Sequence, residues 1–184
     1  MSSSSAQPEV SRTFSTLSLT ERKIMVTVDG SQHSDYALEW VFDNVYRPTD
    51  KLLLVHASAP PAIPEVGFGA VPEHLYSEMI ERNRQQTRHL LKRYEKMTKR
   101  IMHDRLHGKI SIIHEQGHPK EVIVRIANQE KADIVVVASR GLGAIQYAVL
   151  GSTSQFLVNH LKMPVIVVHK PPALASVPAS RGQA

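Results

Sequence analysis

Hydrophobic and polar positions along the chain alternate between two patterns. Short runs rich in Val, Ile and Leu are followed by longer stretches in which apolar residues recur every three or four positions. Continuous apolar runs are typical of strands buried on both faces, and the longer pattern is typical of amphipathic helices. The five predicted strands are Lys23 to Val28, Lys51 to Ala57, Lys109 to Glu115, Ala132 to Ala138 and Pro164 to His169. Their strict alternation with helices, without an internal repeat, predicts an α/β fold with a parallel sheet.

Four helices are expected between these strands. Their apolar faces consist of Ala37, Leu38, Val41 and Val45; Leu90, Tyr94, Met97 and Ile101; Val122, Ile123, Ile126 and Ala127; and Phe156, Leu157 and Leu161. Ser31 and Ser34 can cap the first helix, and Pro119 suits the first turn of the third. The second helix is expected to be long and to pack mainly through its later half. The last helix is expected at 152–161.

The composition adds limits on size and compartment. A chain of 184 residues has room for one self-stabilising domain, predicted at 21–170, between tails at 1–20 and 171–184 that are expected to be disordered. The absence of cysteine excludes disulfides, thiolate metal sites and cysteine nucleophiles. No apolar run approaches the roughly 20 residues of a membrane helix, and the N-terminus lacks a signal pattern. We expect a soluble, cytoplasmic protein.

The positive charge of the chain is concentrated in one region. The formal net charge is +5 and the pI is about 9.6. Much of the excess lies between Glu73 and Arg105, where nine basic residues are interleaved with five acidic ones along a predicted helix. Mixed signs are typical of a solvated helix face, whereas a nucleic-acid surface is the alternative. The interleaving favours the solvated face, with no nucleic-acid partner.

The segment most informative for function runs from the end of the fourth strand to the start of the last helix. It contains Gly141, Gly143 and Gly151, and then Ser152 and Ser154. Glycines let a backbone approach phosphate oxygens, and the amides of a helix N-terminus favour an anion. Alternatively, the glycines only form a turn and cap the helix.

Two common phosphate motifs do not fit this segment. No lysine precedes Ser152, which argues against a P-loop hydrolase. Gln146 stands where the third glycine of a dinucleotide fingerprint belongs. The segment instead resembles the universal stress protein family, whose ATP-binding members carry Gly-x2-Gly-x9-Gly followed by Ser or Thr. Gly141 and Gly151-Ser152 match that spacing, and Ala138 replaces the first glycine.

The resemblance extends over the predicted domain. The segments 24–31, 53–57 and 163–168 are similar to the family's first, second and last strands. The resemblance implies a doubly wound, Rossmann-like fold, similar to the adenine nucleotide alpha hydrolases, with strand order 3-2-1-4-5. It also implies bound ATP accompanied by Mg²⁺ or Mn²⁺. Ala138, at the end of a strand, is expected to have a negative φ and therefore to be tolerated.

The resemblance also implies roles for individual residues. Val28 and Asp29 would line the nucleoside, with Asp29 near the ribose or the phosphate-bound cation, and Ala57 would contact adenine through its backbone. The phosphate-binding residues implied are Arg140, Gly141, Gly143, Gly151, Ser152, Thr153 and Ser154, beside Ala138. From local sequence, Asp29-Gly30 is equally an ordinary turn before a helix. The long segment 58–72 is either a lid or a mobile connector.

The remaining observations bear on activity and assembly. The ten histidines lack metal-ligand spacing, and His56 is interpreted as a structural imidazole. No catalytic triad is recognisable, so at most slow ATP hydrolysis is expected. A homodimer through Val165 to Val168 is implied by the resemblance and by the exposed apolar edge. The functional hypotheses are an ATP-binding stress-response module, an ATPase, and a dimerisation module without nucleotide.

Overall fold

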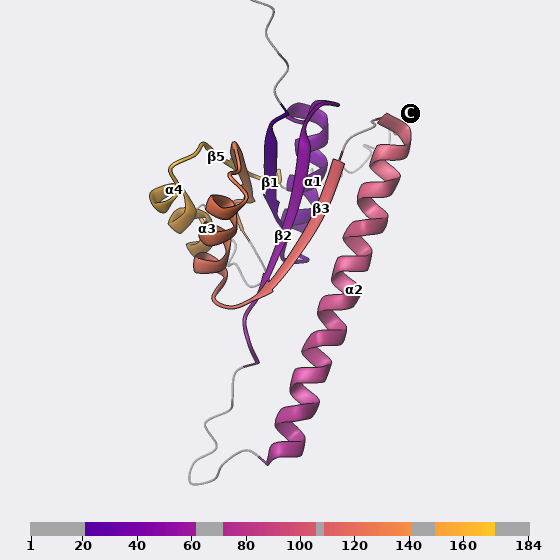
Figure 1. The fold of residues 1–184 in the computed structure, drawn as a ribbon, viewed down its shortest axis with the longest axis vertical. Coiled ribbons are helices and arrows are strands. Elements are labelled where there is room, and N and C mark those ends of the chain that lie inside the picture. The colour runs from indigo at the N-terminus through magenta and orange to yellow at the C-terminus, as the bar shows by residue number, and fades with distance from the viewer. Residues whose placement is uncertain (1–20, 62–71, 106–108, 141–149, 172–184) are drawn as a thin grey trace, which may run out of the picture.

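Strands and helices alternate along the whole folded part of the chain (Figure 1). The computed structural model describes residues 21–61, 72–105, 109–140 and 150–171. The elements are β1 (Lys23–Thr27), α1 (Gln32–Asn44), β2 (Lys51–Ser58), α2 (Glu73–Arg105), β3 (Lys109–Gln116), α3 (Pro119–Gln129), β4 (Ile134–Ala138), α4 (Ser152–His160) and β5 (Val165–Val168). The five predicted strands and four predicted helices are therefore present. The predicted tails, apart from residue 171, lie outside the described residues, as does most of the segment 58–72.

All pairings in the sheet are parallel, and the strand order is β3-β2-β1-β4-β5, which confirms the predicted order. The central strand β1 pairs with β2 on one side and β4 on the other, so that Met25 lies between Leu53 and Val135. The middle strands are apolar at successive positions because helices cover both faces of the sheet. The chain adds β2 and β3 on one side of β1, and then β4 and β5 on the other side. The strand order therefore reverses between β1 and β4.

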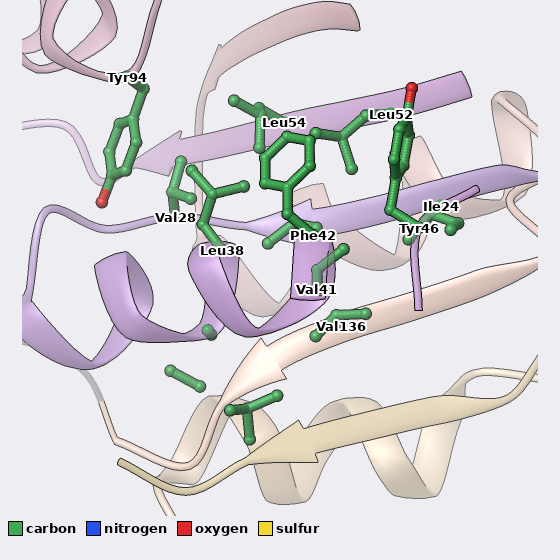
Figure 2. Packing of buried hydrophobic residues seen from close by; sticks show 14 residues of the cluster. Ile24, Val28, Leu38, Val41, Phe42, Tyr46, Leu52, Leu54, Tyr94 and Val136 are labelled. Atoms are coloured by element: carbon green, nitrogen blue, oxygen red, sulfur yellow. The ribbon is translucent and has the colours of Figure 1, made fainter. Parts of the chain in front are cut away.

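Each face of the sheet has its own hydrophobic core. Ile24 and Val26 point toward α1 and α2, whereas Met25 points toward α3 and α4, as successive residues of a strand must. Figure 2 shows the first core, with Phe42 and Leu38 of α1 lying against Leu54 and Val28. The two cores hold the carboxyl ends of all five strands at one edge.

Helix α2 is the longest element, with 33 residues. Its later half packs on the sheet through Tyr94, which is fully buried, and through Leu90, Met97 and Ile101, as predicted. Its earlier half extends past the carboxyl end of β3 (Figure 1), and Leu75 there is 44% exposed. Most of α2's contact with the sheet is therefore made by its later half.

Strand β4 begins two residues later than predicted, at Ile134 instead of Ala132. Lys131 has a φ of +53°, which ends α3, and the Ala132 amide donates to the Ala127 carbonyl at 2.9 Å. Asp133 binds β1 instead, since its carboxylate accepts from the Lys23 amide at 2.7 Å. The other predicted strand ends and the ends of α4 differ by one residue at most, and α3 starts at Pro119 as predicted. The remaining helix ends were not predicted.

Candidate functional site

The candidate site lies at the carboxyl edge of the sheet, between β1 and β4. Val26 pairs with Val136, so Val28 and Ala138 stand two residues further on, at the same level of the edge. Because β1 connects to β2 on one side and β4 continues to β5 on the other, the strand order reverses here. Ligands of open α/β sheets bind at such a reversal. The predicted residues Asp29 and Arg140 follow these two strand ends.

The β1 side of the site is a tight turn into α1. The Asp29 carboxylate accepts from the Ser31 amide at 2.9 Å, and Ser31 caps α1 by accepting from the Ser34 amide at 3.1 Å. Gly30 has a φ of +89°, and a Cβ there would lie 2.9 Å from Leu90 Cδ1. One oxygen of Asp29 therefore stabilises the turn, as the structural interpretation expected. Its half-buried carboxylate still lies at the reversal point.

Helix α2 clamps this turn with two neighbouring residues. The Gly30 amide donates to the Tyr94 hydroxyl at 3.2 Å, and that hydroxyl donates to Asp35 at 2.7 Å. Arg93 donates to both carboxylate oxygens of Asp35, at 2.9 and 3.1 Å, and to the Gly30 carbonyl at 3.3 Å. Sequence reasoning placed Tyr94 in the apolar stripe and missed the clamp. The signal was the hydroxyl itself, since a buried tyrosine needs a hydrogen-bond partner.

The Tyr94 hydroxyl stays protonated. Burial raises the pKa of Tyr94 far above its usual range, and the hydrogen bond to Asp35 and the charge of Asp35 add to this. The hydrogen bond with Ser34, at 2.9 Å, acts in the opposite direction. The ring lies among the core residues, and its oxygen points away from them toward the start of α1 (Figure 2). The clamp is therefore a neutral hydrogen-bonding group at physiological pH.

On the β4 side, the start of α4 is joined to the end of the strand. The Gly151 amide donates to the Ser139 carbonyl at 2.7 Å, and Gly151 is the N-cap of α4. A Cβ on Gly151 would lie 3.1 Å from that carbonyl and 3.6 Å from the Cα of Arg140. The close approach favours glycine at this position. It also brings the N-terminus of α4 to the end of β4, next to the reversal point.

The three hydroxyl residues of α4's first turn differ in exposure. Ser152 is exposed, Thr153 is half-buried and Ser154 is buried. The Ser154 hydroxyl donates to the Gly151 carbonyl at 2.8 Å and lies 3.4 Å from the Ser139 carbonyl. Its hydrogen is thus directed to the protein. A helix leaves its first amides without intrahelical partners, so the amides of this turn are the groups that can bind an anion.

The motif residues before α4 are described only in part. Ala138 ends β4 beside Val168. Among the described non-glycine residues, only Lys131 has a positive φ. Ala138 therefore has a negative φ, as predicted, and carries no left-handed strain. Arg140 is half-buried at the edge. Gly141 and Gly143 lie outside the residues that the structure describes.

Val28 and Ala57 lie at the ends of β1 and β2. The Val28 amide donates to the Val55 carbonyl at 2.9 Å, and its carbonyl accepts from His56 Nδ1 at 2.8 Å. The Val28 amide and carbonyl thus both have hydrogen-bond partners. His56 is a hydrogen-bonded structural imidazole, as interpreted. In a strand, residues two apart direct their backbone groups to the same side. Ala57 lies two residues after Val55, so its backbone groups also face the side of β1. They lie beyond the bond from Val28 to Val55, which is the last one between β1 and β2.

A second histidine stacks on His56 at this edge. The rings of His56 and His114 are 5.6 Å apart, and His114 Nε2 lies 2.9 Å from the Ser58 hydroxyl. Partial burial, together with the neighbouring His56, lowers the pKa of His114. Among the described residues, no three His, Asp or Glu side chains gather closely enough to hold a metal ion. None of the described helices has the length and apolar character needed to cross a membrane.

The chain is similar to known proteins over most of its length. A model of the universal stress protein family matches residues 21–169. The universal stress protein A-like protein of Arabidopsis thaliana is 30% identical over 166 residues, which cover 80% of this chain and 90% of that protein. A universal stress protein of Thermus aquaticus is 31% identical over 147 residues, covering 80% and 98% respectively.

Solved structures share the fold. A universal stress protein from Lactobacillus plantarum superposes with a TM-score of 0.65 at 20% identity, covering 80% of this chain and 97% of that one. A universal stress protein family protein from Arabidopsis thaliana with AMP bound superposes with a TM-score of 0.57 at 26% identity, covering 82% and 92%.

Proposed function

Because the chain belongs to the universal stress protein family, we propose that it binds ATP at the reversal point between β1 and β4 and acts as a stress-response module. The observation that carries this proposal is the 2.7 Å bond from Gly151 to Ser139, which brings the α4 N-terminus to the end of β4. The amides and dipole of that helix start favour phosphate. The relative from Arabidopsis thaliana with AMP bound supports a nucleotide as the ligand.

The proposed phosphate site is built on backbone amides. Those of α4's first turn, at Ser152, Thr153 and Ser154, would bind phosphate oxygens, with the charge of Arg140 near them. Gly141 and Gly143 are proposed to contribute from the loop on the spacing of the motif. The Ser154 hydroxyl is directed to the Gly151 carbonyl, so its contribution would come from the amide.

The nucleoside would lie on the β1 and β2 side of the reversal point. Ala57 is proposed to contact adenine through backbone groups that extend beyond the end of β1. Val28 would only form the floor of the site, since its backbone is paired and its side chain is buried in the core. Asp29 is proposed to face the triphosphate through a Mg²⁺ or Mn²⁺ ion, because a carboxylate among phosphates needs a cation between them. Most ligands of that ion would be phosphate and water.

Calorimetric titration of ATP and of AMP, each with and without Mg²⁺, tests the proposal. The informative variant is Asp29→Asn, which keeps an oxygen for the Ser31 amide and removes the charge. We expect ATP to bind the native chain more tightly with Mg²⁺, and this gain to disappear in Asp29→Asn. Glu39→Gln, an exposed acid on α1, is the matched control and should retain the gain. AMP binding should depend little on Mg²⁺.

Two results would replace this function with another. The absence of binding by either nucleotide would contradict it and favour a dimerisation module. Multiple turnovers of ATP per minute, abolished by Asp29→Ala, would instead favour an ATPase.

A homodimer through β5 is part of the proposal. Strand β5 is at an edge of the sheet, and three of its four residues are half-buried valine or isoleucine. An apolar edge strand invites pairing with a second copy. Light scattering at micromolar concentration should give twice the chain mass. A monomer would contradict the dimer without affecting the nucleotide site.

A further inference from the structure

The basic residues of α2 are more strongly segregated than the interleaved charges of the whole helix suggested. Between Arg82 and Arg100 the helix carries eight of the chain's 22 Lys and Arg residues and one of its 17 Asp and Glu residues, Glu95. This leaves 14 basic and 16 acidic residues for the rest of the chain. The entire positive excess of the protein therefore comes from this part of α2.

Five of these residues form a row that is inclined to the helix axis and crosses the half of the helix away from the sheet. They follow each other at intervals of four, and all are exposed: Arg84, Arg88, Lys92, Lys96 and Arg100. Side chains four apart are neighbours on a helix surface. At a rise of about 1.5 Å per residue, the row is about 24 Å long. The opposite side of the helix holds Tyr94 and packs on the sheet.

The row does not help the helix to fold. Like charges at intervals of four destabilise a helix. Two acidic residues pair with basic residues of this stretch: Glu81 lies 3.9 Å from Arg84, and Glu95 lies 2.6 Å from Lys99. In the part of the chain that the structure describes, no ion pair includes Arg88, Lys92 or Lys96. An external anion would remove this repulsion.

The neighbours of the row determine which anion fits. Every exposed residue from 82 to 100 is polar. A protein partner would need an apolar centre, and a helix that inserts into lipid would need a free apolar face, whereas that face of α2 covers the sheet. Single strands stack on rows of aromatic side chains, whereas His89 is the one exposed aromatic ring between Arg82 and Arg100. A duplex backbone requires only aligned cations and polar donors.

We propose that the basic face of α2, between Arg82 and Arg100, binds the sugar–phosphate backbone of duplex nucleic acid independently of base sequence. This departs from the solvated face expected from the sequence, because the acidic residues of α2 lie mainly outside this stretch. The proposal does not depend on ATP binding.

Fluorescence anisotropy with labelled duplex DNA and duplex RNA of mixed sequence, over a salt series, tests it. The test variant is Arg88→Gln, Lys92→Gln and Lys96→Gln, which retains good helix formers. The matched control is Arg47→Gln, Lys131→Gln and Lys162→Gln, which changes the same charge at exposed positions elsewhere. Circular dichroism checks that both variants fold. The dependence of the native chain's affinity on salt measures the number of phosphate contacts without any variant.

We expect log K of the native chain to fall linearly with log salt by about 0.9 per phosphate contacted. The α2 variant should reduce this slope by about 3 and weaken binding at least about tenfold at about 50 mM salt. The control should stay close to the native chain. Equal losses in both variants would overturn the proposal, as would binding to poly-glutamate or anionic vesicles that is as tight as binding to both duplexes. A preference for one duplex would identify the form bound.

Discussion

The two sides of the reversal point are held by different means. On the β1 side, the turn at Gly30 is fixed by two side chains of a remote helix, the buried Tyr94 and the exposed Arg93. On the β4 side, the start of α4 is joined to the strand through the Ser139 carbonyl, which accepts from Gly151 and lies near Ser154. The first side is thus tied to a remote helix by side-chain contacts. The second consists of local backbone contacts, which are better able to adjust to a phosphate.

The sharpest contrast is between the two glycines. Gly30→Ala is expected to lower the free energy of unfolding by about 2 to 3 kcal/mol, because an L-residue is strained at φ +89° and its Cβ crowds Leu90. Gly151 has a negative φ of −58°, which any residue adopts, so Gly151→Ala is expected to lower the free energy of unfolding by about 1 kcal/mol or less. Urea denaturation of both variants measures the difference. Equal losses would mean that the two sides are held alike.

The tyrosine clamp gives the next largest effect. Tyr94→Phe removes a hydroxyl that joins Gly30, Ser34 and Asp35, and we expect a loss of about 2 kcal/mol. It should also weaken ATP binding, because the turn carrying Asp29 loses its support. The matched variant is Tyr46→Phe, which removes one hydrogen bond to the Asp50 carbonyl, at 3.0 Å.

Tyr46→Phe should lower stability by about 1 kcal/mol and leave ATP affinity unchanged. If both variants reduced ATP affinity equally, the effect would reflect general stability, and the clamp would have no specific link to the turn.

The smallest effect concerns pH at the edge of β2 and β3. Because the folded state lowers the pKa of His114, the unfolded chain binds more protons as the pH falls below the usual histidine pKa of about 6.5. The contribution of His114 to stability is therefore present above that value and is lost toward lower pH. We expect His114→Gln to lose stability less steeply than the native chain between about pH 7 and pH 5. Parallel urea midpoints would refute this.

Local patterns predicted the elements well, with one informative error. Apolar runs and helical spacing located every strand and helix, and Pro119 and Ser31 marked two helix starts as expected. Strand β4 was predicted two residues too long at its start, since Ala132 is apolar but hydrogen-bonds back to α3. An apolar side chain at a strand boundary is compatible with either structure, and only its backbone partner distinguishes them.

The site was predicted in outline by the spacing of glycines, but its supports were not. The segment at Gly151 was recognised because close backbone approaches leave a glycine in the sequence. Ser154 is implied to bind phosphate, but its hydroxyl is directed to the Gly151 carbonyl, which leaves only its amide for that role. A sequence shows that a hydroxyl is present, but its direction depends on the rotamer that packing permits.

By itself, the sequence determined the order of strands and helices, the buried faces and the family, because periodicity and residue spacing are properties of neighbouring positions. Only the tertiary structure decided that the Tyr94 hydroxyl meets the Gly30 amide, 64 residues away. It likewise showed that Arg93 meets Gly30 and Asp35, 63 and 58 residues away. Contacts between remote segments depend on how the helices pack across the sheet, and no local pattern encodes that orientation.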